Sequence, residues 1–500
     1  MEMEIRLGID FFGAREGRRN PISMAVQRLV NPHALLLGMS GAGKSYTIMK
    51  MVEDAARTNP LVRIHVFDVA GDLAIPGASE VDFSRASTAG LNPFRVNPNP
   101  AYGIEYSLET FLRVIDDASA NKLGDRQVQV LRNLVMDVYA EFGFTTNPAT
   151  WTVNALDSRL ISGGNDNRLY LQVPIAEKDS AKANGARWDS ERKLWYVYIN
   201  QYKGAITQWH PAFKQRTYPC LDDIIEYAER IHIERFLGAD QKAIRALGMV
   251  EKAASALRKK KLDAVKRQRY DDIVYDEDAE LELEEKKERA KEAYAEYVNR
   301  IETGVELESI RKYRNVQVLE SVIDRLKNLK ASGLFKANSA PFDPETQIWR
   351  YKVNDLSLEA KKMFVFFQLR ALFDAASERG VQSHVVDIVV LDELGTYSTS
   401  KDKDGGDGII GIIAAQARKF GLALWGATQS PATVPEAVSS SVGTKIILGI
   451  DSGYRDFAVK KFQVEGKLLD WISLKKTMAV QMKEAGATKH KWHWVQIDDS

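Results

Sequence analysis

The sequence is poor in cysteine, which favours a reducing compartment. Cys220 is the single cysteine among 500 residues, so the chain can build neither a disulfide framework nor a zinc site held by several cysteines. No apolar run approaches the roughly 18 to 20 residues of a membrane-spanning helix. The start of the chain carries the acids Glu2 and Glu4 where a signal peptide needs basic residues. We therefore expect a cytoplasmic protein without membrane insertion.

Net charge is also nearly absent. Lys and Arg number 69 against 68 Asp and Glu, which gives +1 at pH 7 and excludes a uniformly basic, histone-like protein. A local basic surface remains compatible with this total, since binding to nucleic acid depends on local charge. Hydrophobic residues make up 45% and charged residues 27%, an ordinary globular composition. The length suffices for two or three hydrophobic cores.

The first informative motif is the glycine-rich loop GMSGAGKS at 38–45. It follows the apolar run 34–37, which we expect to be the first strand, and precedes 46–52, where apolar residues recur at helical spacing. This order is typical of a phosphate-binding P-loop, because glycines let several backbone N–H groups converge on one anion at a helix start. Lys44 is expected to reach the β- and γ-phosphates and Ser45 to ligate magnesium. The expected nucleotide-binding residues here are Gly38, Ser40, Gly41, Ala42, Gly43, Lys44, Ser45 and Tyr46.

A second motif, DIVVLDE, lies at 387–393. Its apolar residues predict a buried strand, and two carboxylates follow at the C-terminal end, where open α/β sheets bind ligands. Asp392 is expected to hold magnesium, directly or through water, and Glu393 to act as general base on the attacking water. The alternative is a buried strand that ends in solvated acids. A kinase would not need the second carboxylate, and the Asn-Lys-x-Asp box of GTPases is absent, so the two motifs together predict an ATPase.

Further polar residues follow a third apolar stretch, 422–427. Either Thr428 or Gln429 is expected to lie beside the γ-phosphate and to sense it. Before this stretch, Arg418 and Lys419 lie at the expected end of a helix. They have two interpretations: they complement the helix dipole, or Arg418 reaches the nucleotide of a neighbouring subunit as an arginine finger.

The order of these motifs resembles the HerA/FtsK superfamily of RecA-like hexameric DNA-pumping ATPases, and most closely its HerA branch. The likeness covers roughly 25–145 and 305–500. The matching pieces are the P-loop, the segment 64–72, the segment 91–94, the acidic strand, and 418–422 with the following Thr428 and Gln429.

This resemblance implies an α/β fold, a RecA-like P-loop NTPase core with a mostly parallel central sheet. It implies ATP and Mg²⁺ bound between the subunits of a homohexameric ring that moves double-stranded DNA, often beside a nuclease or another effector protein. It also implies an acid near the nucleotide on the second strand, which is Asp68 here. HerA proteins usually carry an N-terminal β-barrel, and only some 30 residues precede the first expected strand, so this barrel is expected to be shortened or missing.

The chain between the motifs is longer than such a core needs, which predicts two insertions. The expected parts are a short N-terminal segment at 1–30, the first part of the core at 31–150, a small α+β insert at 165–200, a charged helical insert at 220–305 and the second part of the core at 306–500.

The small insert resembles a domain of unknown function in plasmid primase-like and antirestriction-like proteins. It interleaves cations with aromatic rings at Arg187, Trp188, Lys193, Trp195 and Tyr196, a mixture found on surfaces that bind nucleotide bases and phosphates. We expect the two tryptophans to fill the insert's own core. Arg187 and Lys193 are equally compatible with a structural role and with binding.

The helical insert is almost free of glycine and rich in Ala, Glu, Lys and Arg, which predicts long exposed helices. Bases dominate 252–269 and acids dominate 271–285, so an antiparallel hairpin would pair the two signs. An arm that presents its basic half to DNA or to a neighbouring protein is the alternative. Lys401 and Lys403 are further candidates for contact with the DNA backbone.

The leading hypothesis is therefore an ATP-dependent motor on double-stranded DNA, in defence, DNA processing or mobile-element transfer. Two alternatives stay open. One is a conjugative type IV secretion-like ATPase that drives protein or pilus assembly at a membrane partner. The other is a nucleotide-gated scaffold whose ATP state recruits an effector.

Overall fold

The computed structural model describes residues 3–151, 168–171, 173–174, 177–190, 194–198, 201, 203–209, 218–237, 241–266, 277–299, 312–313, 316–398 and 408–497. The chain divides into two compact units. Unit 1 comprises Met1–Pro93, Glu109–Lys122 and Ala331–Ser500, and it carries the motifs of the expected ATPase site. Unit 2 comprises Phe94–Leu108 and Leu123–Lys330, and it carries both expected insertions.

Unit 1 is built on an 11-stranded sheet. In spatial order its strands are β2 (Pro21–Ala25), β1 (Glu4–Asp10), β14 (Trp492–Gln496), β13 (Thr477–Met482), β12 (Thr444–Gly449), β3 (Ala34–Gly38), β11 (Leu422–Thr428), β10 (Asp387–Leu391), β4 (Arg63–Asp68), β9 (Ile348–Lys352) and β5 (Ser79–Asp82). From β12 to β5 all neighbours are parallel, and the four strands from β2 to β13 are antiparallel. This confirms the predicted α/β fold with a mostly parallel central sheet.

The sheet begins earlier in the chain than expected. Ala34 does not open the first strand, because β1 and β2 precede it and form an antiparallel pair at one end of the sheet. β1 also pairs with β14, so the beginning and the end of the described chain share one edge region. The alternating burial of β1 explains this: Ile5 and Leu7 are buried in the core while Glu4 and Arg6 are exposed.

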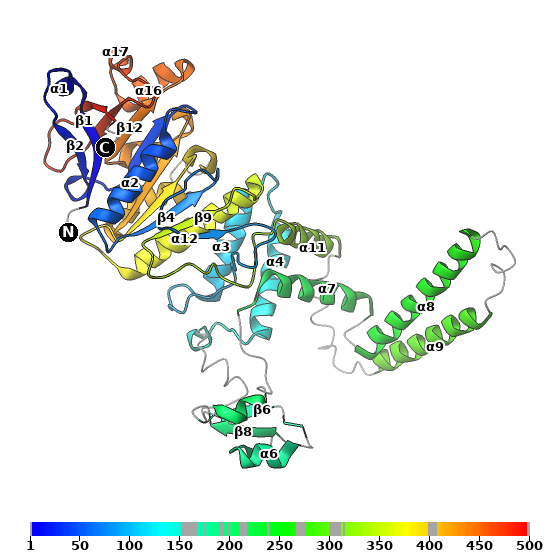
Figure 1. Ribbon diagram of the computed structural model, residues 1–500. Helices are drawn as coiled ribbons and strands as arrows, with labels where there is room; N and C mark the ends of the chain where they lie inside the picture. The colour runs from blue at the N-terminus through cyan, green and yellow to red at the C-terminus, as the bar shows by residue number, and fades with distance from the viewer. Residues whose placement is uncertain are drawn as a thin grey trace. The chain divides into compact units, whose positions relative to one another are not determined.

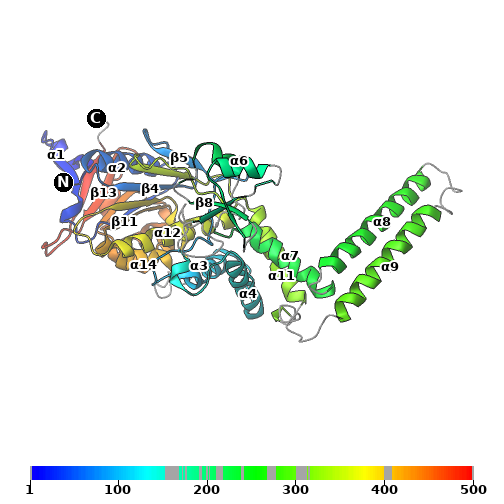
Figure 2. The ribbon, with the colours of Figure 1, turned by 90° about the horizontal axis from the view of Figure 1, so that it is seen from below.

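Helices cover both faces of this sheet. α2 (Lys44–Thr58) packs on one face, where Ile48 and Val52 join strand residues such as Val66 and Val390 in one core cluster. On the other face, Phe364 of α12 (Leu358–Arg379) meets Phe67 of β4, with ring centroids 5.5 Å apart. Figure 2 shows α2 and α12 on opposite sides of the strands. The near-continuous apolar runs of β3, β10 and β11 follow from this double coverage. The other helices of unit 1 are α1 (Phe11–Arg15), α14 (Ile409–Gln416), α15 (Glu436–Ser441), α16 (Arg455–Phe462) and α17 (Gly466–Leu469), and α3 (Gly103–Ala118) contains residues of both units.

Unit 2 contains a group of helices joined by polar contacts. These helices are α4 (Asp125–Glu141), α7 (Leu221–Leu237) and α11 (Val316–Ala331), whose last residue belongs to unit 1. Asp137 of α4 accepts hydrogen bonds from the hydroxyl groups of Tyr227 and Tyr313 and from the ammonium group of Lys312. This carboxylate therefore ties α7 and the segment before α11 to α4.

The small insert forms a three-stranded antiparallel sheet in the order β6 (Arg168–Leu171), β8 (Leu194–Tyr198), β7 (Arg187–Asp189), with α6 (Lys178–Ala183) beside it. Its core consists of Leu171, Ala181, Ala186, Val197, Ile206 and Trp209, with Trp195 partly buried against them. The expectation that both tryptophans of the strands fill this core is wrong for Trp188, which is 52% exposed. Trp209 belongs to the core instead, and Trp188 lies on β7, an outer strand of the sheet in the part of the insert that the structure describes.

The helical insert is an antiparallel hairpin of α8 (Gln241–Lys266) and α9 (Glu277–Asn299), which lie side by side in Figures 1 and 2. Lys242 near the start of α8 pairs with Glu296 near the end of α9, and Lys261 pairs with Glu280 at 2.8 Å. These crossed ion pairs confirm the predicted pairing of a basic helix with an acidic one.

Candidate nucleotide-binding site

The glycine-rich loop adopts the geometry of an anion cradle. β3 ends at Gly38 and α2 begins at Lys44, with Gly41 and Gly43 between them at φ +76° and +98°. These left-handed conformations favour glycine and turn successive N–H groups towards one point. The loop is anchored at its base, because Met39 donates its backbone N–H to the carbonyl of Gly449 at the end of β12. The start of α2 adds the positive end of a helix dipole.

The parallel sheet brings two further motifs to this loop. β3, β11 and β10 are consecutive neighbours, so the residues that follow them meet at one edge. The ammonium group of Lys44 lies 3.8 Å from Oε1 of Glu393, and Nε2 of Gln429 donates to the same oxygen at 2.6 Å. Glu393 is held at φ 53° and ψ 43°, a left-handed conformation that is strained for a residue with a side chain. The fold therefore assembles a lysine, a carboxylate and an amide from positions far apart in the chain.

Asp392 lies just inside this edge and is 5% exposed. Burial, assisted by the negative charge of Glu393, raises the pKa of Asp392 to about 6. Lys44 and the backbone N–H of Glu393, which donates to Oδ1 at 2.9 Å, act in the opposite direction. A buried carboxylate beside a second one is a site that gains from a cation, and the charge of Asp72, which accepts a hydrogen bond from the Ser45 hydroxyl, also raises the pKa of Asp392.

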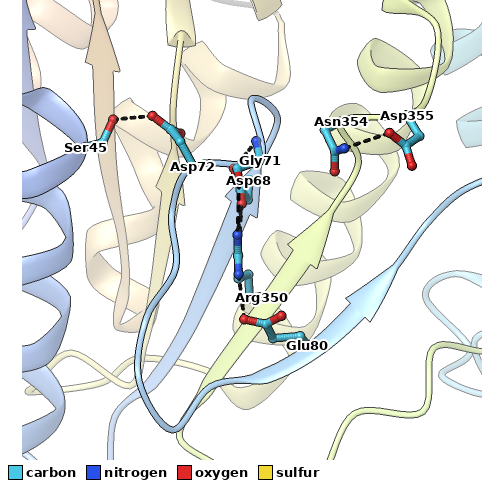
Figure 3. A network of polar contacts seen from close by, with 8 residues as sticks. All are labelled: Ser45, Asp68, Gly71, Asp72, Glu80, Arg350, Asn354 and Asp355. Atoms are coloured by element: carbon cyan, nitrogen blue, oxygen red, sulfur yellow. Dashed lines mark hydrogen bonds and ion pairs between the residues drawn. The ribbon is translucent and has the colours of Figure 1, made fainter. Parts of the chain in front are cut away.

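A second polar network braces the loop that follows β4 (Figure 3). Asp68 is fully buried, and it accepts hydrogen bonds from the Gly71 N–H at 2.7 Å and from Nη2 of Arg350 at 2.6 Å. Arg350 also pairs with Glu80 at 2.6 Å. In the same loop, Asp72 accepts a hydrogen bond from the hydroxyl of Ser45 at 2.7 Å. The carboxylate that reaches the P-loop serine is therefore that of Asp72, while Asp68 holds the loop in place.

Sequence reasoning missed Arg350 and Asp72. Arg350 is the middle residue of β9, between apolar and aromatic neighbours, and its side chain is only 6% exposed. A cation inside such a strand requires a buried acid as its partner, and this was the signal available in the sequence. Asp72 carried no signal of its own, because its contact with Ser45 depends on how the loop after β4 folds back.

Arg418 lies away from this edge. It belongs to the 3₁₀ turn Ala417–Phe420, directly before β11, whereas the nucleotide edge follows β11. Seven extended residues span more than about 20 Å. Arg418 instead lies close enough to His33 for its positive charge to act on that side chain. His33 directly precedes β3, at the N-terminal ends of the parallel strands. The exposed Arg418 and the P-loop of one chain are thus not brought together.

Tyr46, the last of the expected nucleotide-binding residues, lies in the first turn of α2. Its ring is 41% exposed and carries the ammonium group of Lys50 at 5.1 Å from the ring centroid. A cavity of about 470 Å³ lies beside it, lined by residues of α2 and β1 that include Gly8, Tyr46, Lys50 and Asp54. This volume lies within the range of small-ligand pockets. Lys193, Lys401 and Lys403, the other basic candidates, lie outside the described residues.

The sequence comparisons match the small insert, whereas the comparison with solved structures matches nearly the whole chain. The family model of a domain of unknown function, DUF5710, matches residues 168–211. The chain is also 46% identical over 44 residues to DNA primase TraC of Escherichia coli, which is 9% of this chain and 4% of the primase. The chain thus spans only a small part of the curated relatives that it matches. The predicted similarity of the insert to a domain of plasmid primase-like proteins is confirmed.

Among solved structures, the chain is similar to VirB4 of Thermoanaerobacter pseudethanolicus, with a TM-score of 0.54 and 13% identity, covering 99% of this chain and 96% of VirB4. It is also matched to plasmid coupling protein TrwB in complex with ADP and Mg²⁺, with a TM-score of 0.46 and 10% identity over 100% of this chain and 95% of TrwB. At 13% identity the likeness to VirB4 shows the fold alone, and this fold agrees with the predicted α/β core.

No helix in the described ranges combines the length and apolar character required to cross a membrane.

Proposed function

We propose that this chain is an ATP- and magnesium-dependent motor ATPase that moves along double-stranded DNA, acting beside a nuclease or another effector. The observation that carries the proposal is the convergence of Lys44, Glu393 and Gln429 on one edge of a parallel sheet, next to a preformed anion cradle. Each group has a role in phosphoryl transfer, and the three follow three different strands of the sheet, β3, β10 and β11.

The residues present fit ATP and Mg²⁺. The loop from Gly38 to Ser45 would cradle the phosphates and Lys44 would neutralise their charge. Ser45 and Asp392 would hold the metal, with Asp72 close enough to Ser45 to act as a further carboxylate. When bound, the ion supplies charge neutralisation at the transferred phosphoryl group. Tyr46, exposed directly after Ser45 at the start of α2, would be a further contact for the nucleotide.

Glu393 and Gln429 would divide hydrolysis between them. Glu393 is placed to accept a proton from the attacking water, and its Oε1 is at present shared by Lys44 and Gln429. A γ-phosphate between these side chains would compete for both donors and leave Glu393 available to water. Gln429 would thereby sense the nucleotide.

We propose that Arg418 completes the site of a neighbouring subunit in a homohexameric ring. Its position at the edge opposite to the P-loop of its own chain, together with its exposure, supports action in trans. A mixing experiment tests this directly. Lys44→Ala and Arg418→Ala should each be inactive alone, but mixed rings should regain hydrolysis, because intact P-loops of Arg418→Ala subunits meet the arginine of Lys44→Ala neighbours. Two inactive proteins that stay inactive after verified mixing would exclude the trans role.

Hydrolysis with and without duplex DNA at low salt tests the motor itself. We expect duplex DNA to stimulate release of inorganic phosphate by the natural sequence and not by Lys44→Ala. Native mass measurement with ATP and duplex DNA should show a hexamer. A strictly monomeric protein, or hydrolysis indifferent to DNA, contradicts this proposal.

The two other candidates remain testable by the same reagents. A conjugative secretion ATPase shares this fold, so the fold does not separate it from a DNA motor, but its hydrolysis need not respond to duplex DNA. A nucleotide-gated scaffold should keep its function in Glu393→Gln, where binding persists and hydrolysis stops. A motor with this substitution should bind ATP and stall on DNA.

A further inference from the structure

An exposed aromatic surface on the small insert plays no part in the proposed ATPase site. Trp188 of β7 is 52% exposed, and its ring meets that of Trp195 edge to face, with centroids 5.4 Å apart. The two residues are direct cross-strand partners, so they lie on the same face of the sheet. Trp195 is partly buried against the core and thereby fixes the base of the pair, while Trp188 presents its ring to solvent.

Cations lie on both elements beside this pair: Arg187 precedes Trp188 on β7, with its side chain on the other face of the strand, and two lysines lie on α6. Arg187, the neighbour of Trp188, is exposed, and its guanidinium lies 5.1 Å from the ring centroid of Tyr198 on β8. On α6, Lys178 and Lys182 are exposed and one helical turn apart, so they lie on the same side of the helix. We call Arg187, Trp188, Trp195, Lys178 and Lys182 the tryptophan edge.

The acids of the insert do not cancel these charges. Between 168 and 211 the sequence has seven Lys and Arg against four Asp and Glu, together with seven aromatic residues. Two of the acids in the described part are engaged towards the interior. Glu177 accepts from Nε1 of Trp209 at 2.7 Å, and Asp189 accepts from the hydroxyl of Tyr170 at 2.7 Å. With seven bases against four acids, the insert sequence carries a formal charge of +3 and is rich in aromatic residues.

We propose that the tryptophan edge binds single-stranded nucleic acid, a substrate class distinct from the duplex proposed for the motor core. An exposed indole can stack on an unpaired base, whereas the bases of a duplex already stack on each other. Besides stacking on bases, a binding surface must neutralise phosphates, since a single strand carries one phosphate for each base, and the cations do this. The combination of aromatic and basic residues favours a nucleic-acid strand over an apolar peptide as the ligand. An apolar peptide has no regular series of anions to pair with Arg187, Lys178 and Lys182.

Fluorescence anisotropy on the full chain tests this inference. A labelled 20-nucleotide oligo-dT and an oligo-U of equal length are titrated at low salt without ATP, which also shows whether DNA or RNA binds more tightly. Trp188→Ala should weaken binding of the better strand by about tenfold, the effect of losing one stacked base. Arg187→Ala should weaken it less and reduce the slope of log Kd against log salt by about one, as expected for one phosphate contact. Trp188→Phe should retain most of the affinity.

The matched control is Tyr294→Ala, which removes a ring of similar exposure, 46%, from α9. It should leave oligonucleotide binding unchanged. Stimulation of ATP hydrolysis by duplex DNA should also be unchanged in Trp188→Ala, so failure of this inference is distinguishable from failure of the motor. Equal affinities of Trp188→Ala and the natural sequence, or an unlabelled duplex that competes as well as the single strand, would overturn the proposal.

Discussion

The central sheet and the helical hairpin treat charged residues in opposite ways. In the sheet, Arg350 and Asp68 form an ion pair whose side chains are 6% and 0% exposed. In the hairpin, Lys261 and Glu280 form a pair of similar length whose side chains are 44% and 51% exposed. A buried charge without its partner has no interaction that replaces its lost hydration, so removal of the partner is strongly destabilising. A solvated charge that loses its partner is hydrated by water instead.

This difference shows where the molecule depends on individual residues. In unit 1, Asp392 and Asp68 are buried, and each accepts hydrogen bonds from specific donors. Along α8 and α9 the charges make a solvated surface, so their pattern matters more than any one position. Substitutions in the two regions should therefore have effects of very different size.

The largest effect is expected for Glu393→Gln at the nucleotide edge. Removal of a general base should lower the rate of ATP hydrolysis by about 10²- to 10⁴-fold, while the Kd for ATP changes little because Lys44 and the loop remain. Steady-state phosphate release and equilibrium binding of a fluorescent ATP analogue measure the two quantities. Glu436→Gln, an acid of the same unit on α15, is the control and should retain full activity. Full activity of Glu393→Gln would remove Glu393 from the mechanism.

Arg350→Met tests the buried ion pair. Without the guanidinium, Asp68 is left buried and unpaired, so the free energy of unfolding should fall by about 3 to 5 kcal/mol. Urea unfolding followed by tryptophan fluorescence measures this change. Lys291→Ala, which removes an exposed partner of Glu288 in the hairpin, should not move the midpoint measurably. Equal effects of the two variants would break the comparison between buried and solvated charge.

His33 extends the same comparison to pH. It is 1% exposed, and burial lowers its pKa to about 4. The unfolded chain binds this proton near pH 6.5, so between the two values the unfolded state holds more protons and stability falls as pH falls. We expect this group to contribute a loss of roughly 2 kcal/mol between pH 7 and pH 5. His33→Asn keeps an acceptor for the N–H of Leu424 and should reduce this pH dependence. Identical pH profiles for the two proteins would contradict the assignment.

The smallest effect is expected from removing the hairpin. Replacement of 241–299 by a short Gly/Ser linker removes exposed ion pairs and no part of the nucleotide edge, so the Kd for ATP should stay unchanged. Binding of the fluorescent analogue measures it, with Lys44→Ala as the variant that loses binding. A deletion protein unable to bind ATP would show that the hairpin belongs to the core.

The features found from sequence were those encoded by local pattern. The P-loop, the strand before Asp392 and the charged hairpin each occupy one continuous stretch, in which spacing alone reports the backbone conformation. The features missed join distant stretches. Arg350 finds Asp68 across 282 positions, and β1 was not expected as a strand although it pairs with the end of the chain. The sequence pattern places Trp188 in the core of the small insert, whereas in the structure the core contains Trp209, which lies outside the strands.

The sequence by itself determined the class of fold and the chemistry offered to a nucleotide, because glycine conformation, apolar periodicity and the order of the motifs are local properties. Only the tertiary structure decided which side chains meet. It placed Gln429 on Glu393, Asp72 on Ser45 and Arg418 at the opposite edge. The physical reason is that the order of strands in the sheet determines which strand ends become neighbours, and no single segment encodes this order.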